Sequence, residues 1–171
     1  EALILYLACL RAGAIYLPLN TAYTLSELAY FIDDAEPRIV VCAPPSRAAL
    51  EPIVGRLPGS SVVTLGESRQ GSLIDLAQAA SSQFTDVAVQ DDDIAAILYT
   101  SGTTGRSKGA MLTHRNLASN AAALAEIWHF SDRDVLLHAL PIFHTHGLFV
   151  ATNIVLMSQA SMVLLPKFDP D

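Results

Sequence analysis

The sequence predicts an α/β fold with largely parallel sheets flanked by helices. Short apolar runs that read as buried strands alternate with helical segments along the chain. Such alternation is typical of βαβ units, whose parallel strands are covered by helices. The composition agrees, since 51% of the 171 residues are hydrophobic and 16% are charged. Strands covered on both faces have this apolar character.

The first half of the chain opens with two helical patterns. Leucines recur at helical spacing over 2–12, and Gly13 is expected to end that helix. Thr24 and Glu27 have the spacing of a capping box, which predicts a helix over 25–34. The elements expected after it are a buried strand over 38–42, a helix over 46–57, a strand over 61–65 and a helix over 72–80.

A polar, acidic stretch over 81–93 is expected to connect two sub-domain portions of one domain, 1–85 and 86–171. The second portion again alternates strands and helices. Its expected elements are a buried strand over 94–99, a helix from Thr113 to about Trp128, a strand over 135–139, a mostly helical segment over 143–157 and a strand over 161–165.

The most informative stretch, YTSGTTGRSKG over 99–109, follows the apolar strand directly. Glycines let a backbone approach a ligand closely and turn its N–H groups inward. Hydroxyls donate to phosphate oxygens, and Lys108 adds a point charge. These features favour a polyphosphate site. The alternative is a polar surface loop that joins a strand to the next element.

Two other phosphate-binding motifs do not fit this stretch. A Walker loop requires Gly-Lys-Ser/Thr, whereas Lys108 here follows Ser107 and precedes Gly109. The G-x-G-x-x-G pattern fails because Gly102, Gly105 and Gly109 are spaced by three and four residues.

The loop resembles the phosphate loop T-S/T-G-S/T-T-G-x-P-K-G of the acyl- and aryl-adenylate-forming enzymes. Ser107 stands where that family usually has proline. The stretches LRAGAIYLPL (10–19) and PIFHTHG (141–147) are similar to two further family motifs, and all three occur in family order. The run LPIFHTHGLFVATN resembles malonyl-CoA synthetases within this superfamily. The residues that match the loop motif are Thr100, Ser101, Gly102, Thr103, Thr104, Gly105, Lys108 and Gly109.

The resemblance implies a part of the large N-terminal domain of these enzymes and a set of binding residues. Thr100 and residues 101–105 are implied to bind the phosphates of ATP together with Lys108, and Thr104 is implied to face Mg²⁺. His144 is implied as a catalytic residue at the acyl pocket, with His146 as a second residue of that pocket. The alternative for both histidines is a hydrogen-bonded side chain near a helix N-terminus. A metal pair is disfavoured, because further ligands at a convincing spacing are missing.

The implied activity is ATP-dependent activation of a carboxylic acid, malonate for this subfamily, through an acyl-adenylate to the coenzyme A thioester. Alternatives are a medium- or long-chain fatty or aryl acid–CoA ligase and a non-catalytic nucleotide-binding domain. Both chain ends look cut, and family members are several times longer. We therefore expect an N-terminal fragment, inactive alone, whose missing C-terminal portion carries the ribose-binding aspartate and the catalytic lysine.

The net charge, the cysteines and the apolar stretches limit the binding partners and the cellular compartment that we expect. The net charge is −7 and no basic stripe is present, which argues against a nucleic-acid surface. Cys9 and Cys42 are expected to be free thiols in a reduced, cytoplasmic protein. The apolar stretch 147–157 is too short to span a membrane. No role is assigned to His114, His129 or His138.

Overall fold

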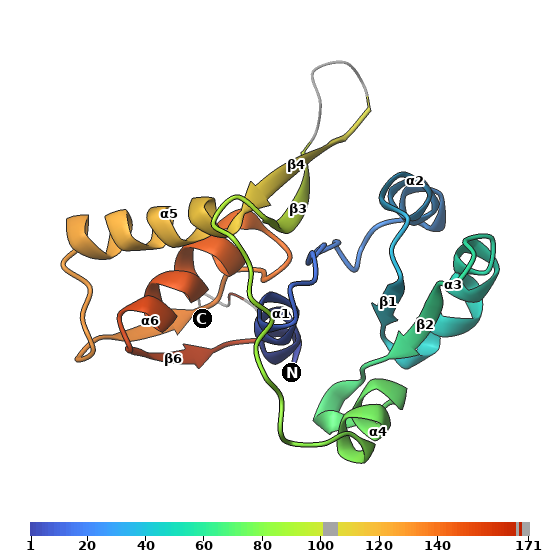
Figure 1. Ribbon diagram of the computed structural model, residues 1–171, viewed down its shortest axis with the longest axis horizontal. Coiled ribbons are helices and arrows are strands. Elements are labelled where there is room, and N and C mark those ends of the chain that lie inside the picture. The colour runs from blue at the N-terminus through green and yellow to red at the C-terminus, as the bar shows by residue number, and fades with distance from the viewer. Residues whose placement is uncertain (101–105, 167, 169–171) are drawn as a thin grey trace. The chain divides into compact units, whose positions relative to one another are not determined.

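The computed structural model describes residues 1–100, 106–166 and 168 of the chain, and Figure 1 shows their arrangement into helices and strands. The predicted α/β class is confirmed. The helices are α1 (Ala2–Arg11), α2 (Leu25–Ala35), α3 (Arg47–Val54), α4 (Ser72–Ala79), α5 (His114–Ile127) and α6 (Asn153–Met157), with a π-helix at His146–Thr152. The strands are β1 (Ile39–Cys42), β2 (Ser61–Thr64), β3 (Ile94–Thr100), β4 (Lys108–Thr113), β5 (Val135–His138) and β6 (Ser161–Leu164).

The chain divides into two units. The first unit contains residue 1 and residues 21–85, and the second contains residues 2–20 and 86–171. The expected portions were continuous in sequence, so α1 lies in the other unit from the one anticipated. The reason is long-range packing: Tyr16, which follows α1, forms a parallel β-bridge with Ala96 of β3.

In the first unit, β1 and β2 pair in parallel, with α2 and α3 packed beside them. The predicted capping box of α2 is present, because Thr24 N–H donates to Glu27 Oε2 at 2.8 Å and Glu27 N–H donates to Thr24 Oγ1 at 3.3 Å. The Thr24 hydroxyl also donates to Glu27 Oε2 at 2.7 Å, and this bond, together with the weaker effect of the bond from Thr24 N–H, lowers the pKa of Glu27. Strand β1 is less buried than predicted, and Ile39 is exposed.

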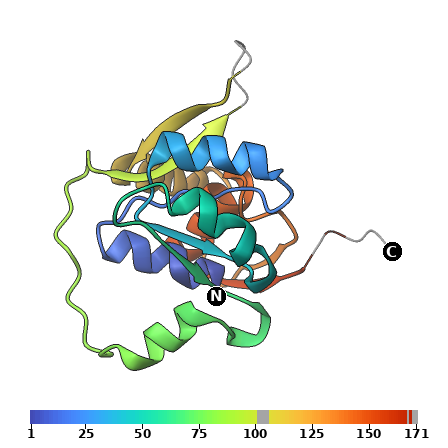
Figure 2. The same ribbon diagram turned by 90° about the vertical axis from the view of Figure 1, so that its right-hand side faces the viewer.

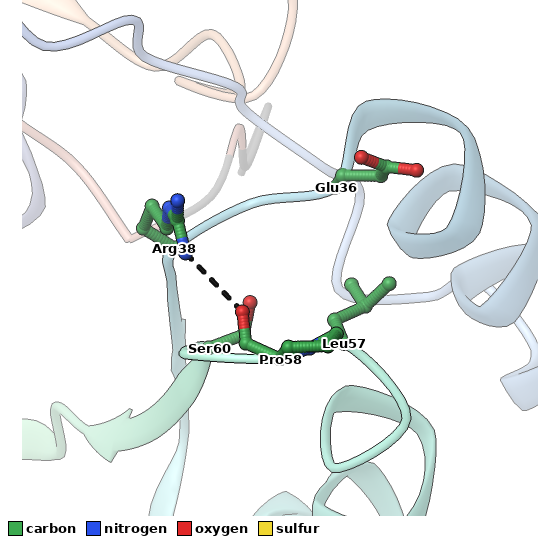
Figure 3. Close-up of a pocket in the computed structure, with 5 residues that line it drawn as sticks. All are labelled: Glu36, Arg38, Leu57, Pro58 and Ser60. Atoms are coloured by element: carbon green, nitrogen blue, oxygen red, sulfur yellow. Dashed lines mark hydrogen bonds between the residues drawn. The ribbon is translucent and has the colours of Figure 1, made fainter.

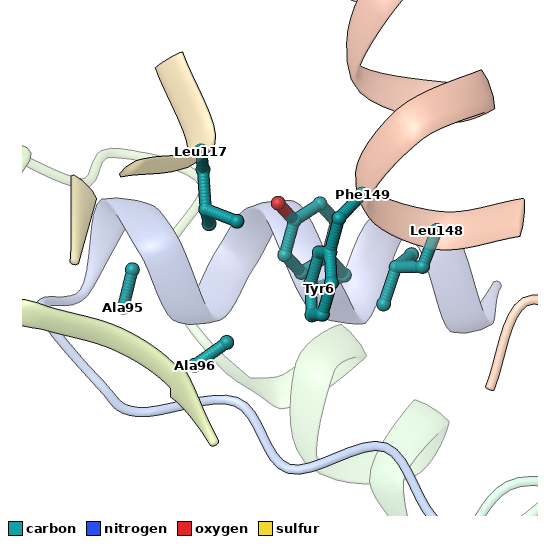
Figure 4. Close-up of a cluster of buried hydrophobic side chains, with 6 residues drawn as sticks. All are labelled: Tyr6, Ala95, Ala96, Leu117, Leu148 and Phe149. Carbon is teal, nitrogen blue, oxygen red and sulfur yellow. The ribbon is translucent and has the colours of Figure 1, made fainter. Parts of the chain in front are cut away.

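The core of the second unit is built from α1, β3, α5 and the helical segment after residue 146. Figure 4 shows the side chains that meet there, with Tyr6 of α1 between β3 and that helical segment. The buried members are Tyr6, Ala95, Ala96, Leu117, Leu148 and Phe149. This packing anchors β3, the strand that leads into the hydroxyl-rich stretch.

The strand pairing of the second unit differs in one respect from the prediction. Strands β5 and β6 are parallel, as expected, but β3 pairs antiparallel with β4. The sequence did not predict β4, because its composition, KGAMLT, is short of β-branched and aromatic residues. Backbone pairing with β3 makes this segment a strand.

The polar stretch over 81–93 and helix α5 agree with what the sequence predicts. Residues 81–93 form no helix or strand and run extended after α4 (Figure 2). Thr113 caps α5 in a capping box, with its hydroxyl accepting from Asn116 N–H at 3.2 Å. No helix in the described residues has both the length and the apolar character required to cross a bilayer.

Candidate functional site

Strands β3 and β4 hold the two ends of the hydroxyl-rich stretch together. Thr100, the last residue of β3, is the register partner of Lys108, the first residue of β4. The Thr100 hydroxyl donates to the Lys108 carbonyl oxygen at 3.5 Å. Both residues are exposed. Ser101, Gly102, Thr103, Thr104 and Gly105 lie outside the described residues, so their predicted phosphate contacts stay predictions.

Gly109 allows close packing at the base of this hairpin. A Cβ atom at Gly109 would lie 2.9 Å from Ile97 Cγ2. That is inside normal van der Waals contact, so the missing side chain lets Ile97 lie over the β4 backbone. Gly109, the one motif glycine among the described residues, thus has a packing role, while Lys108 beside it is exposed. The hairpin therefore presents a cation next to the predicted phosphate loop.

His144 and His146 lie on the turn that precedes and begins the π-helix. His144 N–H donates to the Pro141 carbonyl at 3.2 Å, and Leu148 N–H donates to the His144 carbonyl at 2.9 Å. Both imidazoles are exposed, and within the described part of the chain neither makes a hydrogen bond. The alternative of hydrogen-bonded helix-end histidines is therefore disfavoured. Both rings are open to a ligand.

The π-helix starts with a close backbone contact. A Cβ atom at Gly147 would lie 2.2 Å from the Pro141 carbonyl oxygen, so this position requires glycine. The Gly147 carbonyl oxygen lies 2.8 Å from Nε2 of His138, and the Thr152 hydroxyl donates to the same oxygen at 2.9 Å. No role was expected for His138 from the sequence. A histidine at the end of an otherwise apolar strand was the signal available for it.

An aromatic cluster supports the elements that carry the site. The Tyr6 ring lies 5.3 Å from that of Tyr16 and 5.9 Å from that of Phe149, centroid to centroid. Burial raises the pKa of Tyr16 to about 12, with smaller contributions from Cys9 and Tyr6. Burial also raises the pKa of Tyr6. Both phenols therefore stay protonated near neutral pH and are unsuited to act as bases.

The described residues offer no ready-made metal site. Within them, no group of three or more His, Cys, Asp or Glu side chains is placed to hold a metal ion. Cys9 and Cys42 are free and half-buried, in different units. Desolvation raises the pKa of both thiols, which makes them poor ligands and poor nucleophiles at neutral pH.

A hollow of about 220 Å³ lies in the first unit and contains no predicted site residue (Figure 3). Its lining residues are Glu36, Arg38, Leu57, Pro58 and Ser60. Arg38 Nη1 donates to the Pro58 carbonyl at 3.2 Å, and the Ser60 hydroxyl donates to the Pro37 carbonyl at 2.7 Å. These hydrogen bonds tie the loop before β2 to the start of β1, which is a structural role.

Comparison with known proteins identifies the family. The model of the AMP-binding enzyme family matches residues 1–171, which is the whole chain. The chain belongs to the AMP-binding enzyme family. The resemblance of its three motifs to adenylate-forming enzymes is thereby confirmed, as is the expected fold, which is part of their large N-terminal domain.

Three relatives illustrate the range of similarity within this family. The chain is 61% identical to the ATP-bound crystal structure of MatB from Rhodopseudomonas palustris, with a TM-score of 0.95 over 99% of this chain and 34% of that one. It is 36% identical to the mitochondrial malonate–CoA ligase ACSF3 of Xenopus laevis over 159 residues, which are 93% of this chain and 27% of the relative. A putative long-chain fatty acid–CoA ligase of Rhodopseudomonas palustris is 28% identical, with a TM-score of 0.83 over 97% of this chain and 42% of that one.

The same comparisons show how much of each relative this chain spans. It spans about a third of the length of MatB and about a quarter of that of the ACSF3 ligase. The two units described above are accordingly a part of the AMP-binding fold.

Proposed function

We propose that the full-length protein activates malonate with ATP and transfers the malonyl group to coenzyme A. The observation that carries this proposal is the 61% identity to ATP-bound MatB over 99% of the chain. The similarity to a malonate–CoA ligase from an animal supports it further. A likeness that extends over both units makes a shared substrate chemistry the simplest interpretation.

The proposed reaction has two steps. A carboxylate oxygen of malonate attacks the α-phosphorus of ATP, the bond from that phosphorus to the bridging oxygen of the leaving group breaks, and pyrophosphate departs. The thiol sulfur of coenzyme A, having lost its proton, then attacks the acyl carbonyl carbon, and AMP leaves. Negative charge builds up on the pyrophosphate in the first step, so donors already aimed at it lower the barrier.

The hairpin supplies these donors in the proposal. Thr100 and Lys108 stand opposite each other at its base, and we assign both to the phosphates of ATP. The residues assigned with them are Ser101, Gly102, Thr103, Thr104 and Gly105. The Lys108 ammonium group neutralises charge on the pyrophosphate, and the loop hydroxyls and N–H groups donate to its oxygens.

Mg²⁺ fits the chemistry of this donor set. Mg²⁺ in nucleotide sites is held by substrate phosphates, water and one or two protein oxygens, and the described residues offer no dedicated cage. We assign the Thr104 hydroxyl as the protein ligand. When bound, Mg²⁺ offsets the negative charge of the phosphate oxygens.

His144 and His146 belong to the acyl pocket in this proposal. Both are exposed on the turn over 141–148, where a bound acid can reach them. We assign His144 the catalytic role of orienting the attacking carboxylate and donating to the oxygens around the α-phosphorus. His146 is assigned to the distal carboxylate of a small diacid, for which an imidazole donor is suited.

Substrate competition in the full-length protein tests the activity. Formation of pyrophosphate and acyl-CoA is measured with malonate, methylmalonate, octanoate and benzoate, each with ATP and coenzyme A. We expect malonate to give the highest kcat/KM. Preference for octanoate or benzoate would establish a fatty or aryl acid ligase instead, an alternative favoured by the similarity to a putative long-chain ligase. Absence of pyrophosphate with every acid would contradict an adenylating enzyme.

Nucleotide binding by the 171-residue chain separates a catalytic part from a self-sufficient binding domain. We expect weak or no binding of ATP with Mg²⁺, because the adenine and ribose contacts are proposed to lie in the C-terminal portion. Micromolar binding that Lys108→Ala abolishes would favour a nucleotide-binding domain. Calorimetry at a protein concentration near 100 µM, about the range needed to detect a weak ligand, makes this measurement.

We also propose a reducing compartment, the cytoplasm, for the full-length protein. Both cysteines of the sequence are free thiols, as expected where disulfides do not persist. The ACSF3 relative is named as mitochondrial, so fractionation of cells into cytosol and organelles is the deciding measurement. Recovery in an organelle fraction would contradict the assignment.

A further inference from the structure

His138 is a buried histidine that the proposed chemistry does not use. It ends β5, and its side chain is 1% exposed. Nε2 lies 2.8 Å from the Gly147 carbonyl oxygen. A carbonyl oxygen can only accept, so Nε2 carries a proton and donates it. Within the described part of the chain, this buried Nδ1 has no hydrogen-bond partner.

The acceptor of this bond is itself tightly held. The Gly147 carbonyl oxygen accepts one hydrogen bond from His138 Nε2 at 2.8 Å and a second from the Thr152 hydroxyl at 2.9 Å. Thr152 is 1% exposed. On its other side, Gly147 approaches the Pro141 carbonyl so closely that no side chain fits. Two buried donors and one backbone contact therefore hold the first turn of the π-helix.

This turn carries the two exposed histidines of the candidate acyl pocket. Gly147 directly follows His146, and the segment is closed by the bonds from His144 N–H to Pro141 and from Leu148 N–H to His144. A π-helix is a rare form that occurs frequently at functional sites. Here its beginning is secured by side chains from outside the turn. The direction of the His144 and His146 side chains thus depends on where Gly147 is held.

The side chain of His138 does more than fill space in the core. A leucine at position 138 would occupy a similar space and would leave no buried nitrogen without a partner. It would, however, remove a donor from the Gly147 carbonyl. Burial of an unsatisfied polar atom is costly, so the hydrogen bond from Nε2 is the feature that distinguishes histidine here.

We propose that His138 is a positioning residue for the carboxylate pocket, acting through the Gly147 carbonyl to orient the turn that carries His144 and His146. This role rests on the proposed function, since the pocket is the one assigned to malonate. Catalytic geometry tolerates little displacement, and a shift of about 1 Å at the reacting groups can reduce rates by about a hundredfold. Loss of a buried donor that fixes this turn should therefore weaken binding of the acid more than binding of the nucleotide.

Kinetics of the full-length enzyme test the positioning role. His138→Leu removes the donor and keeps the volume, whereas His138→Gln keeps an N–H donor at a similar reach. We expect His138→Leu to raise KM for malonate by about tenfold or more, with KM for ATP within about twofold of the wild type. In His138→Gln, we expect KM for malonate to return most of the way to the wild-type value. Thr152→Val, which removes the second donor, is expected to act in the same direction.

A stability-matched control separates positioning from general destabilisation. Val155 is buried in α6, and Val155→Ala removes core volume without removing a donor from Gly147. We expect Val155→Ala to lower Tm without changing KM for malonate. If all variants lose stability and KM for malonate stays constant, or if KM for ATP rises equally, the positioning role is contradicted.

A second readout does not depend on activity. The ¹⁵N shifts of the His138 ring report its tautomer, and we expect the Nε2–H form. Amide hydrogen exchange at His144 and Leu148 is expected to speed up in His138→Leu, with exchange in α5 unchanged. The Nδ1–H form, or unchanged exchange, would overturn the inference whichever acid is used. Faster exchange in a protein that turns over no acid would overturn the proposed function and the pocket role with it.

Discussion

The Tyr6 hydroxyl donates to the Asn153 side-chain oxygen at 3.2 Å, which joins α1 to α6 across 147 residues of sequence. Tyr6 is fully buried, and its ring also packs against Tyr16 and Phe149. One side chain thus connects α1 and, through packing on Ala95 and Ala96, β3 with the helical segment after the His144 turn. The two segments proposed to hold phosphate and acid share this anchor.

The hydroxyl and the ring of Tyr6 should contribute separately to stability. We expect Tyr6→Phe to lower the free energy of unfolding by about 1 kcal/mol, because it removes one hydrogen bond. Tyr6→Ala should lower it by about 3–5 kcal/mol, because it also leaves a cavity. Urea unfolding measures both. Tyr23→Phe, at a half-buried tyrosine of the first unit, is the control, and an equal loss there would contradict this account.

Gly147 should tolerate no side chain. In Gly147→Ala the new Cβ would meet the Pro141 carbonyl at 2.2 Å, so the backbone must shift. We expect a loss of about 1–3 kcal/mol in unfolding free energy, the usual cost of overpacking. Gly55→Ala is the matched control, since its Cβ would lie 3.0 Å from its nearest neighbour. Equal stability of the two variants would show that the Pro141 contact is not tight.

Lys108 should matter for adenylation. We expect Lys108→Ala to reduce the rate of pyrophosphate formation in the full-length enzyme by about 10²–10³-fold, because it removes a charge that stabilises the leaving group. Arg133→Ala removes an exposed cation from the same unit and should change the rate by less than about twofold. Comparable losses would indicate a general electrostatic effect rather than a phosphate contact.

The two exposed histidines should differ in their kinetic effect. His144→Ala is expected to lower kcat for adenylation by about 10²-fold, the usual scale for a positioned acid–base side chain. His146→Ala is expected mainly to raise KM for malonate and to leave octanoate turnover unchanged, because it is assigned to the distal carboxylate. Single-turnover adenylation measures the first effect and steady-state kinetics the second. Reversed effects would exchange the two assignments.

Tyr16 should make stability depend on pH in the alkaline range. Its folded pKa is about 12, whereas an unfolded tyrosine ionises near pH 10. Below pH 10 both states keep the proton, and between about 10 and 12 the unfolded state loses it first. Stability should therefore fall with rising pH in this window, by at most about 1.4 kcal/mol per pH unit. Tyr16→Phe should remove this part of the slope in urea unfolding at each pH, and an unchanged slope would contradict the burial effect.

Local patterns were sufficient for much of this chain. The capping box at Thr24, the helix that it begins, the helix after Thr113 and the strand before Thr100 could all be predicted. The reason is that a cap involves residues within three positions of each other, and a buried strand is marked by its own composition. The loop motif pointed to the AMP-binding family for the same reason, and the family match confirmed it. The contacts of the loop residues 101–105 remain predictions.

Contacts between distant residues decided the rest. The antiparallel pairing that makes Lys108–Thr113 a strand, the placement of α1 with β3 through Tyr16 and Ala96, and the burial of His138 against Gly147 all depend on packing across the fold. No local signal in the sequence marks a segment of weak strand propensity as a strand, or a polar residue at a strand end as buried. Its environment exists only once the chain has folded, because tertiary contacts override propensity.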